Sequence, residues 1–235
     1  MRNENRLFII GAPKSGTTSL YKWLNTSSDV SMSKVKEPRY FCNFRERDFS
    51  GPGKKDFFSD HVSTKEQYDR LFEHATCGQI LGEASTDYLS CYEAAENIYN
   101  SKFKKVKIII IIRNPVERAF SEYLHTVRDG IEKTSFIDSI KKEISGERIE
   151  YQPLFHHIRR GLYVKSLEVY FDKFNTEDIL ILKYEDLKNN QNAILKKICK
   201  FLNIEQISIQ ESAKHNQSGV PISYFLHSLE NPDNK

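Results

Sequence analysis

The sequence predicts a single α/β domain of three layers, with a central, mainly parallel β-sheet flanked by helices. Two observations carry this prediction. Short apolar runs alternate along the chain with longer segments in which apolar residues recur at helical spacing. The chain of 235 residues is also long enough for one domain with a full core, and no internal repeat divides it.

Five apolar runs predict strands. Residues 6–12 form a short run that leads into a glycine-bearing loop. Residues 106–112 contain successive isoleucines, whose β-branched side chains favour extended backbone. A third strong strand is expected over residues 178–183, and shorter ones over residues 30–33 and 79–83.

Helices are expected between these strands. Residues 17–25 place Leu20, Trp23 and Leu24 on one face. A second helix begins near Pro115, because the first helical turn accepts proline, and it stops before Gly130. Further helices are expected over residues 93–100, 162–174 and 192–202, with loops and short helices over residues 44–74.

Composition excludes several classes of protein. The formal net charge of +3 is too small to predict a nucleic-acid partner. The longest apolar run, residues 108–112, is far shorter than the roughly 20 residues that span a bilayer. The segment before Gly11 is too short for the apolar part of a signal peptide, so we expect a cytoplasmic protein without a membrane span. The four cysteines lack metal-binding spacing and are expected to be reduced, and nothing indicates an oligomeric state.

A phosphate-binding loop is predicted over residues 11–19, between the first strand and the first helix. Free N–H groups at a helix N-terminus attract phosphate oxygens. Gly16 allows close approach of the backbone, and Lys14 adds a positive charge. Hydroxyl donors follow at Thr17, Thr18 and Ser19.

This segment differs from the Walker A loop, GxxxxGK[ST], at one informative place. Thr17 stands where an ATP-using protein carries its lysine, and the lysine has moved to position 14. A ligand with one 5′-phosphate bearing a further acidic group therefore suits this P-loop-type domain better than a nucleoside triphosphate.

A second anion site is predicted where the isoleucine strand ends. Arg113 leaves the strand at the edge where parallel sheets bind ligands. Ser121 lies about two turns into the following helix, so both residues can reach one phosphate if that helix runs beside it. The alternative for Arg113 is a surface ion pair of little energetic value.

Together, residues 13–19 and 113–121 resemble the two cofactor signatures of the sulfotransferase family. The resemblance implies that Lys14, Ser15, Gly16, Thr17 and Thr18, with Ser19 beside them, bind the 5′-phosphosulfate end of 3′-phosphoadenosine 5′-phosphosulfate (PAPS). It implies that Arg113 and Ser121 bind the 3′-phosphate, and that the product is adenosine 3′,5′-bisphosphate (PAP).

Further stretches resemble the carbohydrate, or heparan-type, branch of that family. Residues 36–41 are similar to its KEPxFF segment, and residues 81–88 to the strand end that carries its catalytic glutamate. Residues 161–167 and 182–187 resemble its later helix and strand. The resemblance spans residues 6–225 and implies transfer of a sulfuryl group to a hydroxyl or amine of a carbohydrate or other small acceptor.

The chain departs from the family at its end. The heparan-type branch carries a late Lys-Gly-Arg-type loop over the 3′-phosphate and adenine, and no such loop follows residues 215–221. We therefore expect residues 1–235 to form one sulfotransferase domain that lacks the usual C-terminal segment.

The expected mechanism is an in-line displacement that depends on positioning and charge stabilisation. Lys14 is expected to stabilise the leaving oxygen, so no metal is required. Glu83 is the first choice for the proton acceptor and for a contact to the acceptor, because it follows the strand segment 79–82 and is therefore expected to face the ligand edge of the sheet. His125, four residues after Ser121, is the second choice.

Each of these assignments has a structural alternative. Glu83 could be a surface or capping glutamate, and His125 a packing residue. Lys36, which is expected to complement sulfate charge in acceptor binding, could be one more solvated lysine. Two other functions share the loop and the fold, namely a P-loop nucleotide kinase and a nucleotide-binding protein that has lost catalysis.

Overall fold

A computed structural model describes residues 5–57 and 61–208 of the chain. In this part of the chain the sheet has five parallel strands in the order β2-β3-β1-β4-β5. The strands are β1 (Asn5–Gly11), β2 (Val30–Met32), β3 (Ile80–Ala84), β4 (Lys105–Ile112) and β5 (Ile179–Lys183). The three-layer α/β fold predicted from the sequence is confirmed, and so are its five strands.

The central strands are buried on both faces. Phe8, Ile10, Ile108 and Ile110 point into one core, and their neighbours Leu7, Ile9, Ile109 and Ile111 point into the other. Successive side chains of a strand alternate between faces, so a continuous apolar run fits only a sheet that is covered on both sides.

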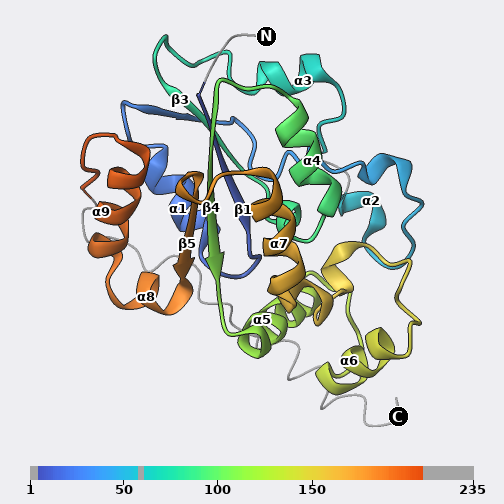
Figure 1. The fold of residues 1–235 in the computed structure, drawn as a ribbon. Helices are drawn as coiled ribbons and strands as arrows, with labels where there is room; N and C mark the ends of the chain where they lie inside the picture. Colours follow the sequence, from blue (N-terminus) through green and yellow to red (C-terminus); the bar gives the residue numbers. More distant parts are fainter. Residues whose placement is uncertain (1–4, 58–60, 209–235) are drawn as a thin grey trace.

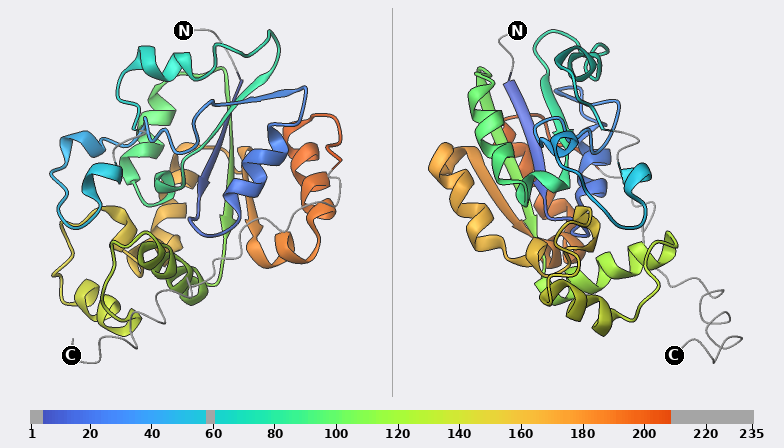
Figure 2. Two further views of the ribbon diagram at one scale, coloured as in Figure 1. Left: turned by 180° about the vertical axis from the view of Figure 1, so that it is seen from behind. Right: turned by 90° about the vertical axis from the view of Figure 1, so that its right-hand side faces the viewer.

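Two groups of helices provide the cover (Figure 1, Figure 2). Helices α1 (Thr17–Leu24) and α9 (Gln191–Leu202) pack on one face. Helices α4 (Tyr92–Asn100) and α7 (Tyr163–Lys173) pack on the other, together with Tyr68 of α3 (Lys65–Arg70). The helices predicted over residues 17–25, 93–100, 162–174 and 192–202 are therefore confirmed in type and place.

The carboxyl ends of the strands point toward α5 (Pro115–Arg128) and α6 (Phe136–Ile144), which lie beyond that edge of the sheet (Figure 1). The remaining elements are short: η1 (Phe44–Glu46), α2 (Lys54–Phe57), η2 (Thr86–Leu89), η3 (Pro153–Phe155), η4 (Arg159–Gly161), η5 (Thr176–Asp178) and α8 (Tyr184–Asn189). Since ligands of parallel sheets bind beyond the carboxyl ends, η2, α5 and the loop after β1 define the edge of interest.

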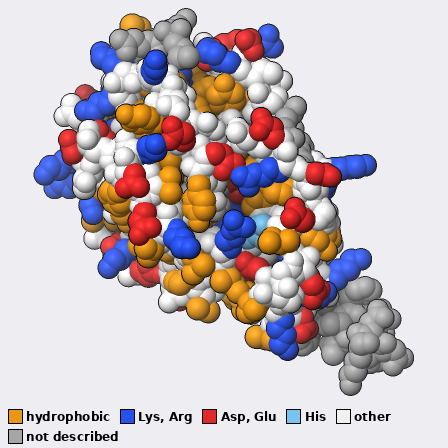
Figure 3. Space-filling model, turned by 45° about the vertical axis from the view of Figure 1, so that its right-hand side comes forward, with side chains coloured by type: hydrophobic (Ala, Val, Ile, Leu, Met, Phe, Trp, Pro, Cys, Tyr) orange, Lys and Arg blue, Asp and Glu red, His pale blue; other side chains and the backbone are white. Residues whose placement is uncertain are grey.

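The surface carries both signs of charge. On the face drawn in Figure 3, basic side chains lie among acidic ones rather than forming one continuous basic area. Within the described ranges, no helix has the length and apolar character needed to span a membrane. The predicted departure after residues 215–221 lies outside the described residues.

Candidate functional site

The loop between β1 and α1 has a backbone that only glycine allows at one position. Gly16, the N-cap of α1, has a φ of 87°. A Cβ atom there would lie 2.6 Å from Cδ2 of Leu187, so both the dihedral angle and the packing require glycine. Ser15 is fully buried, and its hydroxyl donates to the Pro13 carbonyl at 3.4 Å. The predicted phosphate loop is thus a tight, well-packed turn.

The start of α1 offers an anion-binding surface. Gly16 brings no side-chain cap, and the first turn of the helix contains no acidic residue. The N–H groups of this turn therefore keep their positive character for a ligand. Thr18 and Ser19 are partly exposed beside them, whereas Thr17 is buried. A phosphate group fits this set of donors.

Arg113 joins the two predicted anion sites directly. It follows β4, and its Nη1 donates to the carbonyl oxygen of Lys14 at 2.9 Å. Its guanidinium carbon lies 4.5 Å from the centre of the Tyr184 ring. An ion pair to Glu117 at 3.3 Å is also present, so the surface pair considered from the sequence exists alongside the contact to the loop.

The N-terminus of helix α5 lies beside Arg113 and is capped by Asn114. The Asn114 side chain accepts from the N–H groups of Val116 at 3.0 Å and Glu117 at 3.3 Å, and Pro115 occupies the first helical position. This start directs the helix so that Ser121 is partly exposed one turn before His125. The predicted phosphate ligands thus belong to one strand–helix unit, with Arg113 between β4 and α5 and Ser121 in the middle of α5.

Lys14 and His125 lie close enough at this edge for the charge of one to act on the other. Burial lowers the pKa of His125, and the positive charge of Lys14 lowers it further. Burial likewise lowers the pKa of Lys14, with Arg128 as the next cause. His125 Nε2 lies 3.6 Å from the carboxylate of Asp129. The structure therefore brings two predicted catalytic residues together, and it adds Arg128, which the sequence did not single out.

Glu37 lies at the carboxyl end of β3. Its backbone N–H donates to the Ala84 carbonyl at 2.8 Å, and its carboxylate accepts from the Thr86 N–H at 2.7 Å. Lys36 forms an ion pair with the same carboxylate. Thr86 also lies close to Gly11, where the phosphate loop begins, because a Cβ atom on Gly11 would lie 3.3 Å from the Thr86 carbonyl oxygen. Through its bond to Thr86, Glu37 is therefore held next to the start of the phosphate loop. The side chain is 19% exposed and can meet a ligand.

Sequence analysis missed Glu37, although it stands beside Lys36 in the segment that was compared with KEPxFF. The available signal was that segment. Glu37 and Thr86 of η2 are 49 residues apart in the sequence. No local sequence pattern could therefore predict their contact.

Glu83 does not reach the ligand edge of the sheet. It sits within β3 opposite Phe8, and 1% of it is exposed. Its Oε1 accepts from the hydroxyls of Tyr88 at 3.0 Å and Tyr68 at 3.3 Å. Side chains of a strand point to its faces rather than past its end, so the expected position at the edge is corrected here. The activity of a Glu83→Gln variant tests the catalytic role that the sequence predicted for this residue.

Burial raises the pKa of Glu83 to about 8, so the carboxyl is protonated in the folded protein at neutral pH. The unfolded chain releases this proton near pH 4.5. Between these values the folded state binds more protons than the unfolded state, and stability falls as pH rises.

We therefore expect wild-type stability to drop by on the order of 3 kcal/mol between pH 5 and pH 8 relative to the Glu83→Gln variant, which has no proton to lose. Urea unfolding of both proteins across this range measures the difference. Parallel curves for the two proteins would show that Glu83 is ionised in the fold.

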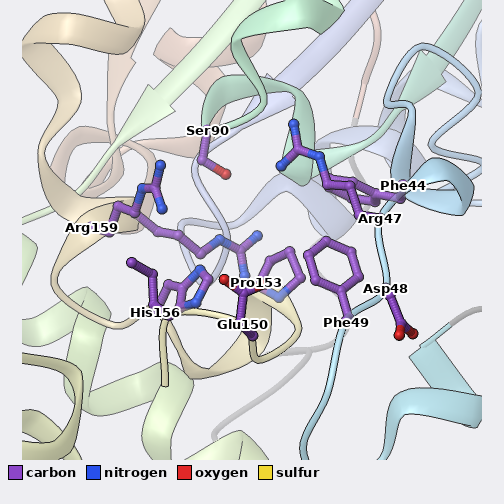
Figure 4. Close-up of a pocket in the computed structure, with 11 residues that line it drawn as sticks. Phe44, Arg47, Asp48, Phe49, Ser90, Glu150, Pro153, His156 and Arg159 are labelled. Carbon is purple, nitrogen blue, oxygen red and sulfur yellow. The ribbon is translucent and has the colours of Figure 1, made fainter. Parts of the chain in front are cut away.

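Two cavities lie away from the phosphate loop. One of about 280 Å³ is bordered by Phe49, Ser90, His156 and Arg159, with none of the loop residues in its wall (Figure 4). A larger one, of about 1040 Å³, is bordered by Asn5, where β1 begins, and so lies at the opposite edge of the sheet. The anion site at the strand ends is thus distinct from both cavities.

A parallel sheet in which a glycine-bearing loop joins the first strand to a helix, and in which a second strand ends at Arg113 beside that loop, defines an α/β protein of the P-loop class. Within that class, the family model described as "Sulfotransferase domain" matches residues 4–227. The chain belongs to this sulfotransferase family.

Individual relatives agree with this assignment. The crystal structure of a sulfotransferase from Alicyclobacillus acidocaldarius superposes with a TM-score of 0.83 at 30% identity, covering 98% of this chain and 92% of that one. Carbohydrate sulfotransferase 15 of Mus musculus is 24% identical over 261 residues, covering 90% of this chain and 46% of that protein. Heparan sulfate glucosamine 3-O-sulfotransferase 3B1 of Mus musculus is 26% identical over 210 residues, covering 89% and 49%. The chain thus spans about half the length of these two curated relatives.

Proposed function

We propose that the chain transfers a sulfuryl group from PAPS to a hydroxyl or amine of a carbohydrate acceptor. One observation carries the proposal: the Arg113 side chain hydrogen-bonds the Lys14 carbonyl at 2.9 Å, so two anion sites adjoin. Membership of the sulfotransferase family supports the reaction, and the names of the two curated relatives support a sugar acceptor.

The donor supplies an activated sulfuryl group when it is bound. The N–H groups at the start of α1, with Thr18 and Ser19, hold its 5′-phosphate end. Arg113 and Ser121 hold its 3′-phosphate, which ATP lacks. Ser15 and Thr17 are buried and support the loop from within.

Lys14 stabilises negative charge on the leaving oxygen. His125 lies beside it and is neutral at pH 7, because burial and Lys14 keep its pKa below the ordinary value of 6.5. A neutral imidazole can accept a hydrogen bond or a proton at this edge.

Glu37 is the proton acceptor that the geometry favours. It is oriented by the Thr86 N–H and borders the phosphate loop, whereas Glu83 is enclosed and protonated at neutral pH. Lys36, paired with Glu37, adds a positive charge beside this carboxylate. A general base of this kind contributes about 10²- to 10⁴-fold to a rate.

Isothermal titration calorimetry tests the nucleotide. We expect PAP to bind more tightly than ATP with magnesium, because the loop has no Walker lysine after Gly16. Tighter binding of ATP would support the kinase alternative. Transfer of labelled sulfate from PAPS to a panel of saccharides tests the reaction, and PAP binding without any transfer would support a protein that has lost catalysis. The cytoplasmic location expected from the sequence stays a prediction.

A further inference from the structure

A continuous chain of buried charged side chains runs along the carboxyl edge of the sheet. Arg39 Nε lies 2.6 Å from Asp87 Oδ2, and Asp87 Oδ1 lies 2.6 Å from Arg160 Nη2. Arg160 Nη1 lies 2.5 Å from Glu122 Oε1, and Arg118 Nη1 lies 2.7 Å from Glu122 Oε2. The four innermost side chains are at most 3% exposed.

Arg160 links the two halves of this row of ion pairs. Asp87 follows Thr86, whose N–H binds Glu37 on the acceptor side. Glu122 follows Ser121 and precedes His125 on α5, the donor side. One guanidinium thus bonds both the η2 segment and α5, and it spans the gap between the proton acceptor and the donor-binding helix.

The surrounding backbone holds Arg160 in this position. A Cβ atom on the next residue, Gly161, would lie 3.1 Å from Cβ of Pro115, so η4 approaches the start of α5 closely. Burial alone would lower the pKa of Arg160, but Glu122 and Asp87 raise it, which keeps the guanidinium charged. Both carboxylates are paired in turn with further arginines.

A contribution to folding stability is by itself a weak explanation for this row of buried ion pairs. Removing charges from water costs several kcal/mol for each ion, and well-packed apolar residues often serve stability equally well. A planar guanidinium does provide two donors in a fixed geometry. What the arrangement supplies is a defined separation between two elements that carry reacting groups.

We propose that Arg160 is a positioning residue, which sets the distance between Glu37, held through Thr86, and α5 with Ser121 and His125. The inference rests on the proposed sulfuryl transfer. A misplacement of about 1 Å between reacting groups can cost about 10²-fold in rate. Arg160 therefore influences catalysis without contact to the donor or the acceptor.

The test compares Arg160→Lys with Arg148→Lys. Lysine keeps the charge but cannot hold both carboxylates in the guanidinium geometry. Arg160 also borders the cavity of Figure 4, which leaves room for the shorter side chain to adjust. Arg148 is an equally suitable control, since it is 5% exposed and bonds Glu132 at 2.5 Å and Ser139 at 2.8 Å, beyond α5.

We expect Arg160→Lys to lower kcat about 10- to 100-fold per PAP-binding site, with PAP affinity within about 3-fold of wild type. Arg148→Lys should lose comparable stability and keep its kcat. Counting active sites by PAP titration removes unfolded protein from the comparison. Equal kcat values for the two variants would overturn the proposal and leave Arg160 a structural residue.

A second readout does not depend on activity. In Arg160→Lys, amide hydrogen exchange should become faster in Thr86–Leu89 and in the middle of α5, and in Arg148→Lys it should not. Unchanged exchange in these segments would overturn the proposed link even if no acceptor were turned over. Loss of the proposed function would instead show as a wild-type protein that neither binds PAP nor transfers sulfate.

Discussion

Replacing Glu37 with glutamine is expected to lower kcat about 10²- to 10⁴-fold, the range that a general base contributes. Glutamine keeps the size of the side chain, and its carbonyl oxygen can still accept from the Thr86 N–H, which Glu37 now does at 2.7 Å. It cannot take a proton from an acceptor hydroxyl. Steady-state transfer of labelled sulfate gives kcat, and calorimetry should show PAP affinity within about 3-fold of wild type.

Glu83→Gln is the matched comparison. Both changes replace a carboxyl group by an amide, but Glu83 is enclosed by Tyr68 and Tyr88 and bonded to their hydroxyls. We expect its kcat at pH 6.5 to stay within about 3-fold of wild type, because the carboxyl is protonated there. The opposite ranking, with Glu83→Gln inactive and Glu37→Gln active, would restore Glu83 as the base.

The sheet could be predicted because its strands carry their own signal. The runs around Ile9 and Ile110 are apolar without interruption, as strands buried on both faces must be. Helices α6 and α8 were not predicted. Helix α8 has a single buried residue, Leu187, within six positions, so it has no apolar stripe of the kind that marks a core-facing helix. Helix α6 does carry Ile137, Ile140 and Ile144 at helical spacing, so its signal was present in the sequence, although Ile137 and Ile144 are exposed in the fold.

The nucleotide side of the site was accessible to sequence reasoning because each half is local. Gly16 and Lys14 stand within one loop, and Arg113 and Ser121 within one strand–helix unit. The acceptor side is not local. Glu37 contacts Thr86 of η2 only after the chain has folded. Glu83 was favoured instead because it stands at the end of an apolar run that predicts a strand.

The same division explains why the ion-pair chain was missed. Asp87 and Arg160 are separated by 73 residues. Glu122 is next to the predicted ligand Ser121 in sequence, but its side chain is buried in the protein. Charged residues are usually solvated, and an isolated Asp, Glu or Arg in a sequence gives no sign that its partners will bury it.

Replacing Arg113 with alanine is expected to weaken PAP binding about 10- to 100-fold, the cost of losing a hydrogen bond to a charged phosphate. The affinity for adenosine 5′-monophosphate, which has no 3′-phosphate, should change by less than about 3-fold. Arg113 also bonds the Lys14 carbonyl, so its loss could disturb the phosphate loop itself. Calorimetry with both nucleotides distinguishes this disturbance from loss of the proposed contact to the 3′-phosphate.

Glu117→Gln provides the control for the ion pair that Arg113 now makes at 3.3 Å. If Arg113 serves the 3′-phosphate, removing this exposed competitor should leave PAP affinity unchanged or raise it a few-fold, since exposed pairs are worth about 0–1 kcal/mol. If Arg113 instead exists to pair with Glu117, both variants should lose stability alike and neither should discriminate between the two nucleotides. Equal weakening of PAP and adenosine 5′-monophosphate in Arg113→Ala would place the arginine's role in the loop, and the 3′-phosphate would have to be bound elsewhere.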